Sequence, residues 1–165
     1  MRNQCILYVE DDENERFLMR HAFKAADIRQ PLHVVADGEQ AITYLSDACL
    51  GGCGAGDLIP CLVLLDLHLP GISGLEVLEW IRSQPGLTTL VVILFSSSQD
   101  TRDVESAYRL GANSFISKPR DLSKHLEFAR LLKGWWLECN QFSEADEVYS
   151  HSSYASAGAL AHSPA

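Results

Sequence analysis

Short apolar runs alternate with longer amphipathic stretches along the chain up to about residue 137. The apolar runs have the length of strands and predict β-structure at 5–9, 32–36, 61–65, 90–95 and 114–117. Between them, apolar residues recur three or four positions apart, which predicts helices at 13–26, 38–47, 75–82, 99–110 and 122–137. The run at 61–65 is apolar throughout, as is typical of a strand buried on both faces of a parallel sheet. Five strands alternating with five helices predict a doubly wound α/β fold, a three-layer sandwich around a five-stranded parallel sheet.

Two segments depart from this alternation. The stretch at 49–60 holds four glycines, too many for a helix, and predicts a flexible insertion before the third strand. The stretch at 138–165 has four acidic residues, no Lys or Arg and many Ser and Ala, which predicts a disordered or partly ordered tail. We therefore expect one domain over 4–137.

The charge of the chain limits its partners. Thirteen Lys and Arg stand against 22 Asp and Glu, a net charge of -9, and no basic patch is visible. This balance disfavours binding to nucleic acid or to an anionic membrane surface. No apolar run approaches the length of a membrane span or a signal peptide, so we expect a cytoplasmic protein. The five cysteines follow no C-x-x-C spacing and are expected to be reduced thiols rather than metal ligands.

Polar and charged residues follow the apolar strands at the point where each is expected to end. Because the carboxyl ends of parallel strands meet at one edge of the sheet, these residues should lie close together. Three carboxylates crowded there would repel one another, and a hard divalent cation such as Mg²⁺ would relieve the repulsion. The residues are Glu10, Asp11 and Asp12 after the first strand, Asp66 after the third, Ser96–Ser98 after the fourth and Lys118 after the fifth. Within this set, Asp12 and Ser98 also suit the N-caps of the helices that follow them.

Four motifs give the chain a resemblance to a known family. They read Val9-Glu10-Asp11-Asp12, Leu65-Asp66-Leu67-His68-Leu69-Pro70-Gly71, Phe95-Ser96-Ser97 and Ser117-Lys118-Pro119. In this order they resemble the receiver domain of two-component response regulators, over roughly residues 4–137. The chain looks most like the stand-alone receivers associated with bacterial phytochromes, which also carry an insertion before the third strand and an aromatic-rich last helix, here Trp135-Trp136-Leu137.

The resemblance implies a flavodoxin-like fold and a role for each matching residue. Asp66 would be the phosphoacceptor. Glu10, Asp11 and Asp66, with the backbone carbonyl of His68, would hold Mg²⁺. The phosphate would be stabilised by Lys118 and Ser96, with Ser97 beside them, and Ser96 and Phe115 would form the conformational switch. The family more often has Asp where this chain has Glu10, so Glu10 is expected to reach the metal through water.

The resemblance implies a signalling function rather than an enzymatic one. The chain would take a phosphoryl group from a sensor histidine kinase, of the bacteriophytochrome type, and signal through a change in its partner surface. The alternative is a magnesium-dependent phosphatase with Asp66 as nucleophile. That class uses a second Asp two residues later, and this chain has His68 there. A flavin binder of similar fold is disfavoured, because its phosphate loop follows the first strand, where this chain has three acids.

The last predicted helix carries two apolar stripes. At about 100° per residue, Leu122, Leu126, Ala129 and Trp136 share one face, whereas Phe128, Leu131 and Trp135 fall nearly opposite. Covering a sheet needs only one stripe. The second predicts a homodimer interface through this helix, and the alternatives are a tail folded over it or a helix broken near Gly134.

Overall fold

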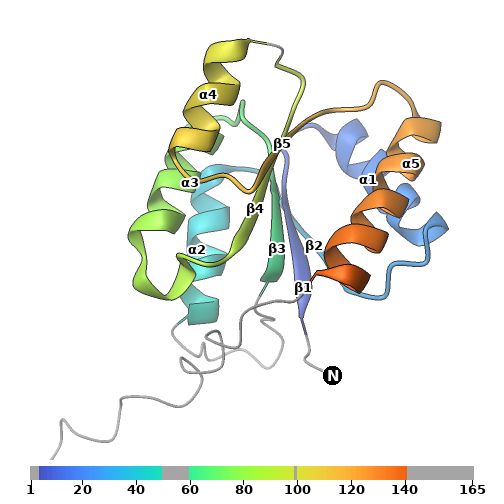
Figure 1. The fold of residues 1–165 in the computed structure, drawn as a ribbon, viewed down its shortest axis with the longest axis horizontal. Helices are drawn as coiled ribbons and strands as arrows, with labels where there is room; N and C mark the ends of the chain where they lie inside the picture. Colours follow the sequence, from blue (N-terminus) through green and yellow to red (C-terminus); the bar gives the residue numbers. More distant parts are fainter. Residues whose placement is uncertain (1–3, 50–59, 99, 141–165) are drawn as a thin grey trace, which may run out of the picture.

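The computed structural model describes residues 4–49, 60–98 and 100–140. Its five strands form one parallel sheet in the order β2-β1-β3-β4-β5, so the predicted fold class is confirmed (Figure 1). The order places β1 and β3 side by side in the middle of the sheet, with β4 next to β3. The strands are β1 (Cys5–Val9), β2 (Leu32–Val35), β3 (Pro60–Leu65), β4 (Val91–Ser96) and β5 (Ser114–Ser117).

Helices cover both faces of the sheet, with α1 and α5 on one side and α2, α3 and α4 on the other (Figure 1). Because each crossover between parallel strands passes through a helix, the alternation in the sequence leads directly to this three-layer arrangement. The helices are α1 (Glu13–Ala25), α2 (Gly38–Cys49), α3 (Gly74–Ser83), α4 (Thr101–Arg109) and α5 (Leu122–Leu132), with a 3-10 turn η1 (Pro85–Leu87) and a π-helical turn η2 (Lys133–Cys139).

The core consists of two apolar layers, one on each side of the sheet. Every residue of β1, β3 and β4 is buried, which explains why these strands are apolar on both faces. Side chains of α1 and α5, among them Met19, Phe23 and Phe128, fill the layer on one side. Side chains of α2 and α3, among them Leu45 and Leu78, fill the layer on the other. The sheet is therefore a rigid platform whose strand ends have fixed positions.

The prediction for the last helix was wrong in two respects. The regular helix ends at Leu132, not at 137, and residues 133–139 form a π-helical turn, which agrees with the alternative of a helix broken near Gly134. The buried face consists of His125, Phe128, Ala129 and Leu132, so Phe128 points into the core and not outward. The apolar pattern misled because His125 is polar yet fully buried, and omitting it rotated the expected face.

The segments predicted as an insertion and a tail are largely outside the described part of the chain. Of 49–60, Cys49 ends α2 and Pro60 begins β3, and the rest lies outside the described residues. Of 138–165, residues 138 and 139 belong to η2, residue 140 follows it, and the rest again lies outside. Within the described ranges, no helix has both the length and the apolar character needed to span a membrane.

Candidate functional site

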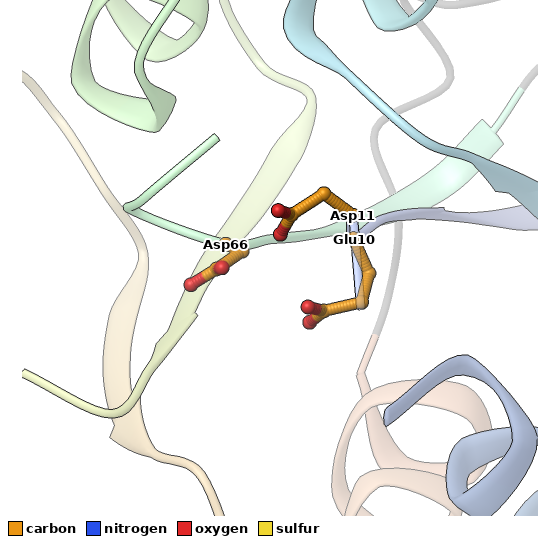
Figure 2. A group of neighbouring side chains, drawn as sticks. All are labelled: Glu10, Asp11 and Asp66. Carbon is orange, nitrogen blue, oxygen red and sulfur yellow. The ribbon is translucent and has the colours of Figure 1, made fainter. Parts of the chain in front are cut away.

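Three carboxylates from two neighbouring strands meet at the carboxyl edge of the sheet (Figure 2). The parallel ladder continues past the strand ends, because the Glu10 N–H donates to the Val35 carbonyl and the Asp66 N–H donates to the Val9 carbonyl, both at 3.0 Å. These bonds fix the backbone on which the carboxylates stand. One oxygen each of Glu10, Asp11 and Asp66 lies within 4.8 Å of the others. Carboxylate oxygens at this spacing are a donor set that fits a hard divalent cation.

Lys118 joins two of these carboxylates. Its Nζ lies 2.6 Å from Glu10 Oε2 and 3.1 Å from Asp66 Oδ2. The Lys118 backbone N–H donates to the Ser96 carbonyl at 2.9 Å, so the lysine starts from the end of β5, beside β4. The second oxygen of Asp66, Oδ1, accepts the Leu67 N–H at 2.7 Å. Both oxygens of Asp66 therefore already have a hydrogen-bond donor.

Burial controls the electrostatics of the Glu10–Lys118 pair. Glu10 is fully buried, and its desolvation raises the pKa of its carboxyl group, although hydrogen bonds from Lys118 and Tyr8 partly oppose this. Burial by itself lowers the pKa of Lys118, but the hydrogen bond and the charge of Glu10 outweigh it and the pKa is raised. The lysine is thus a cation, and three carboxylates around one cation leave a negative excess that attracts a further positive ion.

The acidic residues after β1 divide into two groups. Asp11 is exposed and its carboxylate belongs to the cluster, as Figure 2 shows. Asp12 instead caps α1, as predicted, and its side chain accepts the N–H groups of Asn14 at 2.7 Å and Glu15 at 3.2 Å. The Asp12 carboxylate is thus engaged with the start of α1 and is not part of the cluster of Glu10, Asp11 and Asp66.

The serines after β4 differ in exposure and in their contacts. Ser96 is fully buried, and its Oγ accepts the Ser98 N–H at 3.1 Å. Ser97 is exposed and lines the cavity beside the acidic cluster. The expectation that Ser98 caps α4 was wrong, because Asp100 accepts the Arg102 N–H and the helix begins at Thr101. A carboxylate two residues further along supplies the stronger cap.

The side chains of two further predicted residues, Phe115 and His68, are not part of the acidic cluster. Phe115 is half-buried on β5 and packs against the core layer of α2 and α3. Its backbone N–H donates to the Tyr108 hydroxyl at 3.2 Å. His68 is exposed in the loop after Asp66. The structure thus groups Glu10, Asp11, Asp66 and Lys118, with Ser96 and Ser97 at the adjacent strand end, and keeps Phe115 apart from them.

Sequence reasoning missed three residues that border the site. Glu15 and Arg120 line its cavity of about 550 Å³. The Tyr8 hydroxyl donates to Glu10 Oε2 at 2.9 Å. The spacing of Tyr8 and Glu10 gave a signal, because residues two apart along a strand point to the same face of the sheet. Tyr8 lies within an apolar run, however, and the run by itself indicates only a buried strand.

Comparisons with known proteins agree with this geometry. The family model of the response regulator receiver domain matches residues 6–130. Response regulator Rcp1 of Synechocystis is 32% identical over 135 residues, which cover 82% of this chain and 90% of Rcp1. The structure of Rcp1 in its Mn²⁺-bound form superposes with a TM-score of 0.74 at 29% identity, covering 85% of this chain and 99% of Rcp1.

Two further solved structures are similar over most of the chain. The phosphorylated cyanobacterial phytochrome response regulator RcpA has a TM-score of 0.76 at 30% identity and covers 84% of this chain and 97% of its own. RPA3017, a response regulator in red light signalling of R. palustris, has a TM-score of 0.76 at 27% identity, with coverage of 85% and 98%.

The family decides between the functions that the sequence left open. Receiver domains bind divalent metal and are phosphorylated by sensor histidine kinases, and members of this family are signalling proteins rather than enzymes. An edge-of-sheet cluster of carboxylates with one lysine fits that chemistry. The chain belongs to the response regulator receiver family and is a response regulator of two-component signalling.

Proposed function

We propose that Asp66 is the residue that receives the phosphoryl group. The contact of 3.1 Å between its Oδ2 and Lys118 Nζ, at the centre of the carboxylate cluster, carries this proposal. A carboxylate oxygen of Asp66 forms the new bond to phosphorus, and the bond from phosphorus to the imidazole nitrogen of the donor phosphohistidine breaks. The leaving imidazole takes a proton from water. Lys118 faces the charge that develops on the phosphoryl oxygens.

The proposal includes Mg²⁺ as the resident cation. Glu10, Asp11, Asp66 and the backbone carbonyl of His68 would hold it, and when bound it neutralises charge on the transferring phosphoryl oxygens. The negative excess of the cluster supports this choice. Glu10 already bonds Lys118 and Tyr8, so we assign it contact with the ion through a water molecule. Asp11, which is exposed, is assigned a more direct role.

The response to phosphate is assigned to the serines after β4 and to Phe115. Ser96 Oγ now accepts a backbone N–H, and turning its hydroxyl toward phosphorylated Asp66 would break that bond. Ser97 is exposed and lines the cavity, where its hydroxyl can donate to a phosphate oxygen. Phe115 lies two residues before Ser117, the strand neighbour of Ser96, and would fill the space that the movement opens.

The partners we propose are a histidine kinase of the phytochrome type and a second copy of the chain. The first rests on the similarity to RcpA. The second rests on the α5 groove, an apolar hollow of about 400 Å³ that includes Ile116, Pro119, Leu131 and Trp135. Leu131 is 66% exposed and Trp135 is 70% exposed. We assign the protein and its interaction with the kinase to the cytoplasm.

Charge on the groove supports self-association. Lys124 and Glu127 both line it, and they carry opposite charges one turn apart on α5. Within one chain, Lys124 Nζ lies 2.8 Å from Glu127 Oε2, and a two-fold axis would let two such ion pairs exchange partners between copies. A Leu131→Glu, Trp135→Glu variant should therefore be monomeric by light scattering, whereas the control Phe17→Glu, which changes an exposed aromatic on α1, should leave the dimer intact. A wild type that stays monomeric at high micromolar concentration would contradict this.

Acetyl phosphate tests the phosphoacceptor assignment. With Mg²⁺, the wild type should gain the mass of one phosphoryl group in a linkage that hydroxylamine cleaves, because acyl phosphates react in this way. Asp66→Asn should gain none. The matched control is Asp12→Asn, since Asn caps a helix as well as Asp does, and it should be phosphorylated like the wild type. A hydroxylamine-labile phosphoryl group on Asp66→Asn would refute the assignment.

A further inference from the structure

Tyr8 is a buried tyrosine whose hydroxyl points at the functional site. It lies on β1, two residues before Glu10, so the two side chains share a face of the sheet. Its exposed fraction is 0%, and its hydroxyl donates to Glu10 Oε2 at 2.9 Å. A buried phenol must find a partner for its O–H, and here that partner is a carboxylate of the site.

The tyrosine ring is held in place by the core. It meets the Phe95 ring edge-on, with centroids 6.3 Å apart and planes at 74°. Phe95 in turn packs against Phe128 of α5, with centroids 4.7 Å apart. Because β1 is a central strand and the ring is enclosed between the sheet and the helices α1 and α5, the hydroxyl is a fixed donor. It cannot follow Glu10 if Glu10 moves.

Glu10 is the link between this fixed donor and the phosphoacceptor. Its Oε2 receives Tyr8 and also Lys118 Nζ, at 2.6 Å, and the same ammonium lies 3.1 Å from Asp66. The other Glu10 oxygen accepts the Asp12 N–H at 3.3 Å, its one donor among the described residues. Of the direct contacts made by Glu10, the one to Lys118 orients the lysine over Asp66. The hydrogen bond from Tyr8 fixes the oxygen that makes it.

We propose that Tyr8 is a positioning residue for phosphoryl transfer, whose hydroxyl holds Glu10 so that Lys118 stays over Asp66. This rests on the proposed function of Asp66 and Lys118. Without the hydroxyl, Glu10 loses a charge-assisted hydrogen bond and can turn about its side-chain bonds, and the ammonium turns with it. Orienting Lys118 over Asp66 then costs free energy at each transfer, and the rate of phosphorylation falls.

The test uses Tyr8→Phe, which keeps the ring and its packing against Phe95. At saturating Mg²⁺ and acetyl phosphate, the rate of Asp66 phosphorylation should fall about tenfold, as expected for loss of one hydrogen bond to a charged group. The control is Tyr44→Phe, which removes a tyrosine hydroxyl that contacts the Cys5 thiol and not the site. It should phosphorylate at the wild-type rate.

A double-mutant cycle separates positioning from a general loss of stability. If Tyr8 acts through Glu10, Tyr8→Phe should slow phosphorylation in the wild type but have no further effect on a Glu10→Ala variant, which has no side-chain oxygen to accept the tyrosine O–H. The readout independent of phosphorylation is the carboxyl ¹³C resonance of Glu10 in the metal-free protein, which Tyr8→Phe should shift and Tyr44→Phe should not. In the wild type, the Tyr8 hydroxyl proton should also exchange slowly with water.

The outcomes distinguish the positioning role of Tyr8 from the proposed function of Asp66 on which it rests. If the wild type is phosphorylated on Asp66 and Tyr8→Phe matches it in rate and in the Glu10 resonance, the role of Tyr8 is refuted and that of Asp66 stands. Equal slowing in the wild-type and Glu10→Ala backgrounds also refutes it. If the wild type is not phosphorylated on Asp66, the proposed function itself fails.

Discussion

Gly74 occupies a position where the structure has no room for a side chain. It is the first residue of α3, after the N-cap Ser73, and its N–H donates to the Leu67 carbonyl at 3.0 Å. A Cβ placed on Gly74 would lie 2.0 Å from the carbonyl oxygen of Asp66. The start of α3 therefore rests directly against the backbone of the proposed phosphoacceptor, and Gly74→Ala should disturb both.

The size of the effect follows from that distance. Ordinary contact begins at 3.4 Å, so the Cβ and the oxygen must separate by about 1.4 Å. Overpacking of this kind costs about 1–3 kcal/mol or more. The better helix propensity of Ala offsets at most about 1 kcal/mol of this cost. We expect a net loss of about 2 kcal/mol in the free energy of unfolding. A shift of Asp66 by about 1 Å should also slow its phosphorylation about a hundredfold.

Urea unfolding and acetyl phosphate labelling measure the two effects. Gly134→Ala is the matched control, because a Cβ there has nothing within 4 Å and is added to a helical turn. It should be as stable as the wild type or slightly more so, with the same phosphorylation rate. The reasoning fails if Gly74→Ala keeps both the unfolding midpoint and the phosphorylation rate of the wild type.

Three further predictions concern charge and stability. Burial raises the pKa of Glu10 above 4.5, so its contribution to stability is present below that pH and is lost as pH rises through the raised pKa. Glu10→Gln should remove this part of the pH dependence in the metal-free protein, and parallel urea midpoints for the two proteins from pH 4.5 to 8 would contradict it. Arg82→Ala removes three hydrogen bonds, two to backbone carbonyls around the α4–β5 turn and η1 and one to a side chain, and should destabilise the protein by about 2–3 kcal/mol. Arg102→Ala, which breaks an exposed ion pair, should change the free energy of unfolding by less than about 1 kcal/mol. Equal losses of stability in Arg82→Ala and Arg102→Ala, measured by urea unfolding, would count against the reasoning. Asp11→Ala should abolish Mg²⁺ binding measured by calorimetry, while Asp12→Ala should largely preserve it. Equal losses would show that the two acids were assigned to the wrong roles.

The sequence by itself determined the layers of the fold and the membership of the site. Apolar runs without alternation marked strands buried on both faces, and those strands had to be covered by the amphipathic segments between them. Once the sheet was parallel, the residues that follow its strands had to meet at one edge. The sequence pattern alone therefore predicts the grouping of Glu10, Asp11, Asp66 and Lys118 that the structure shows.

Only the tertiary structure decided the contacts that cross between elements. The bonds of Lys118 to Glu10 and Asp66 join residues more than fifty positions apart, and no local pattern encodes their distances. The inward face of α5 depends on His125, which is buried because Glu15 of α1 lies 3.1 Å from its Nε2. Gly74 is required because the start of α3 approaches the Asp66 carbonyl. Spacing along a chain predicts which face a residue occupies, but packing between elements sets what that face meets.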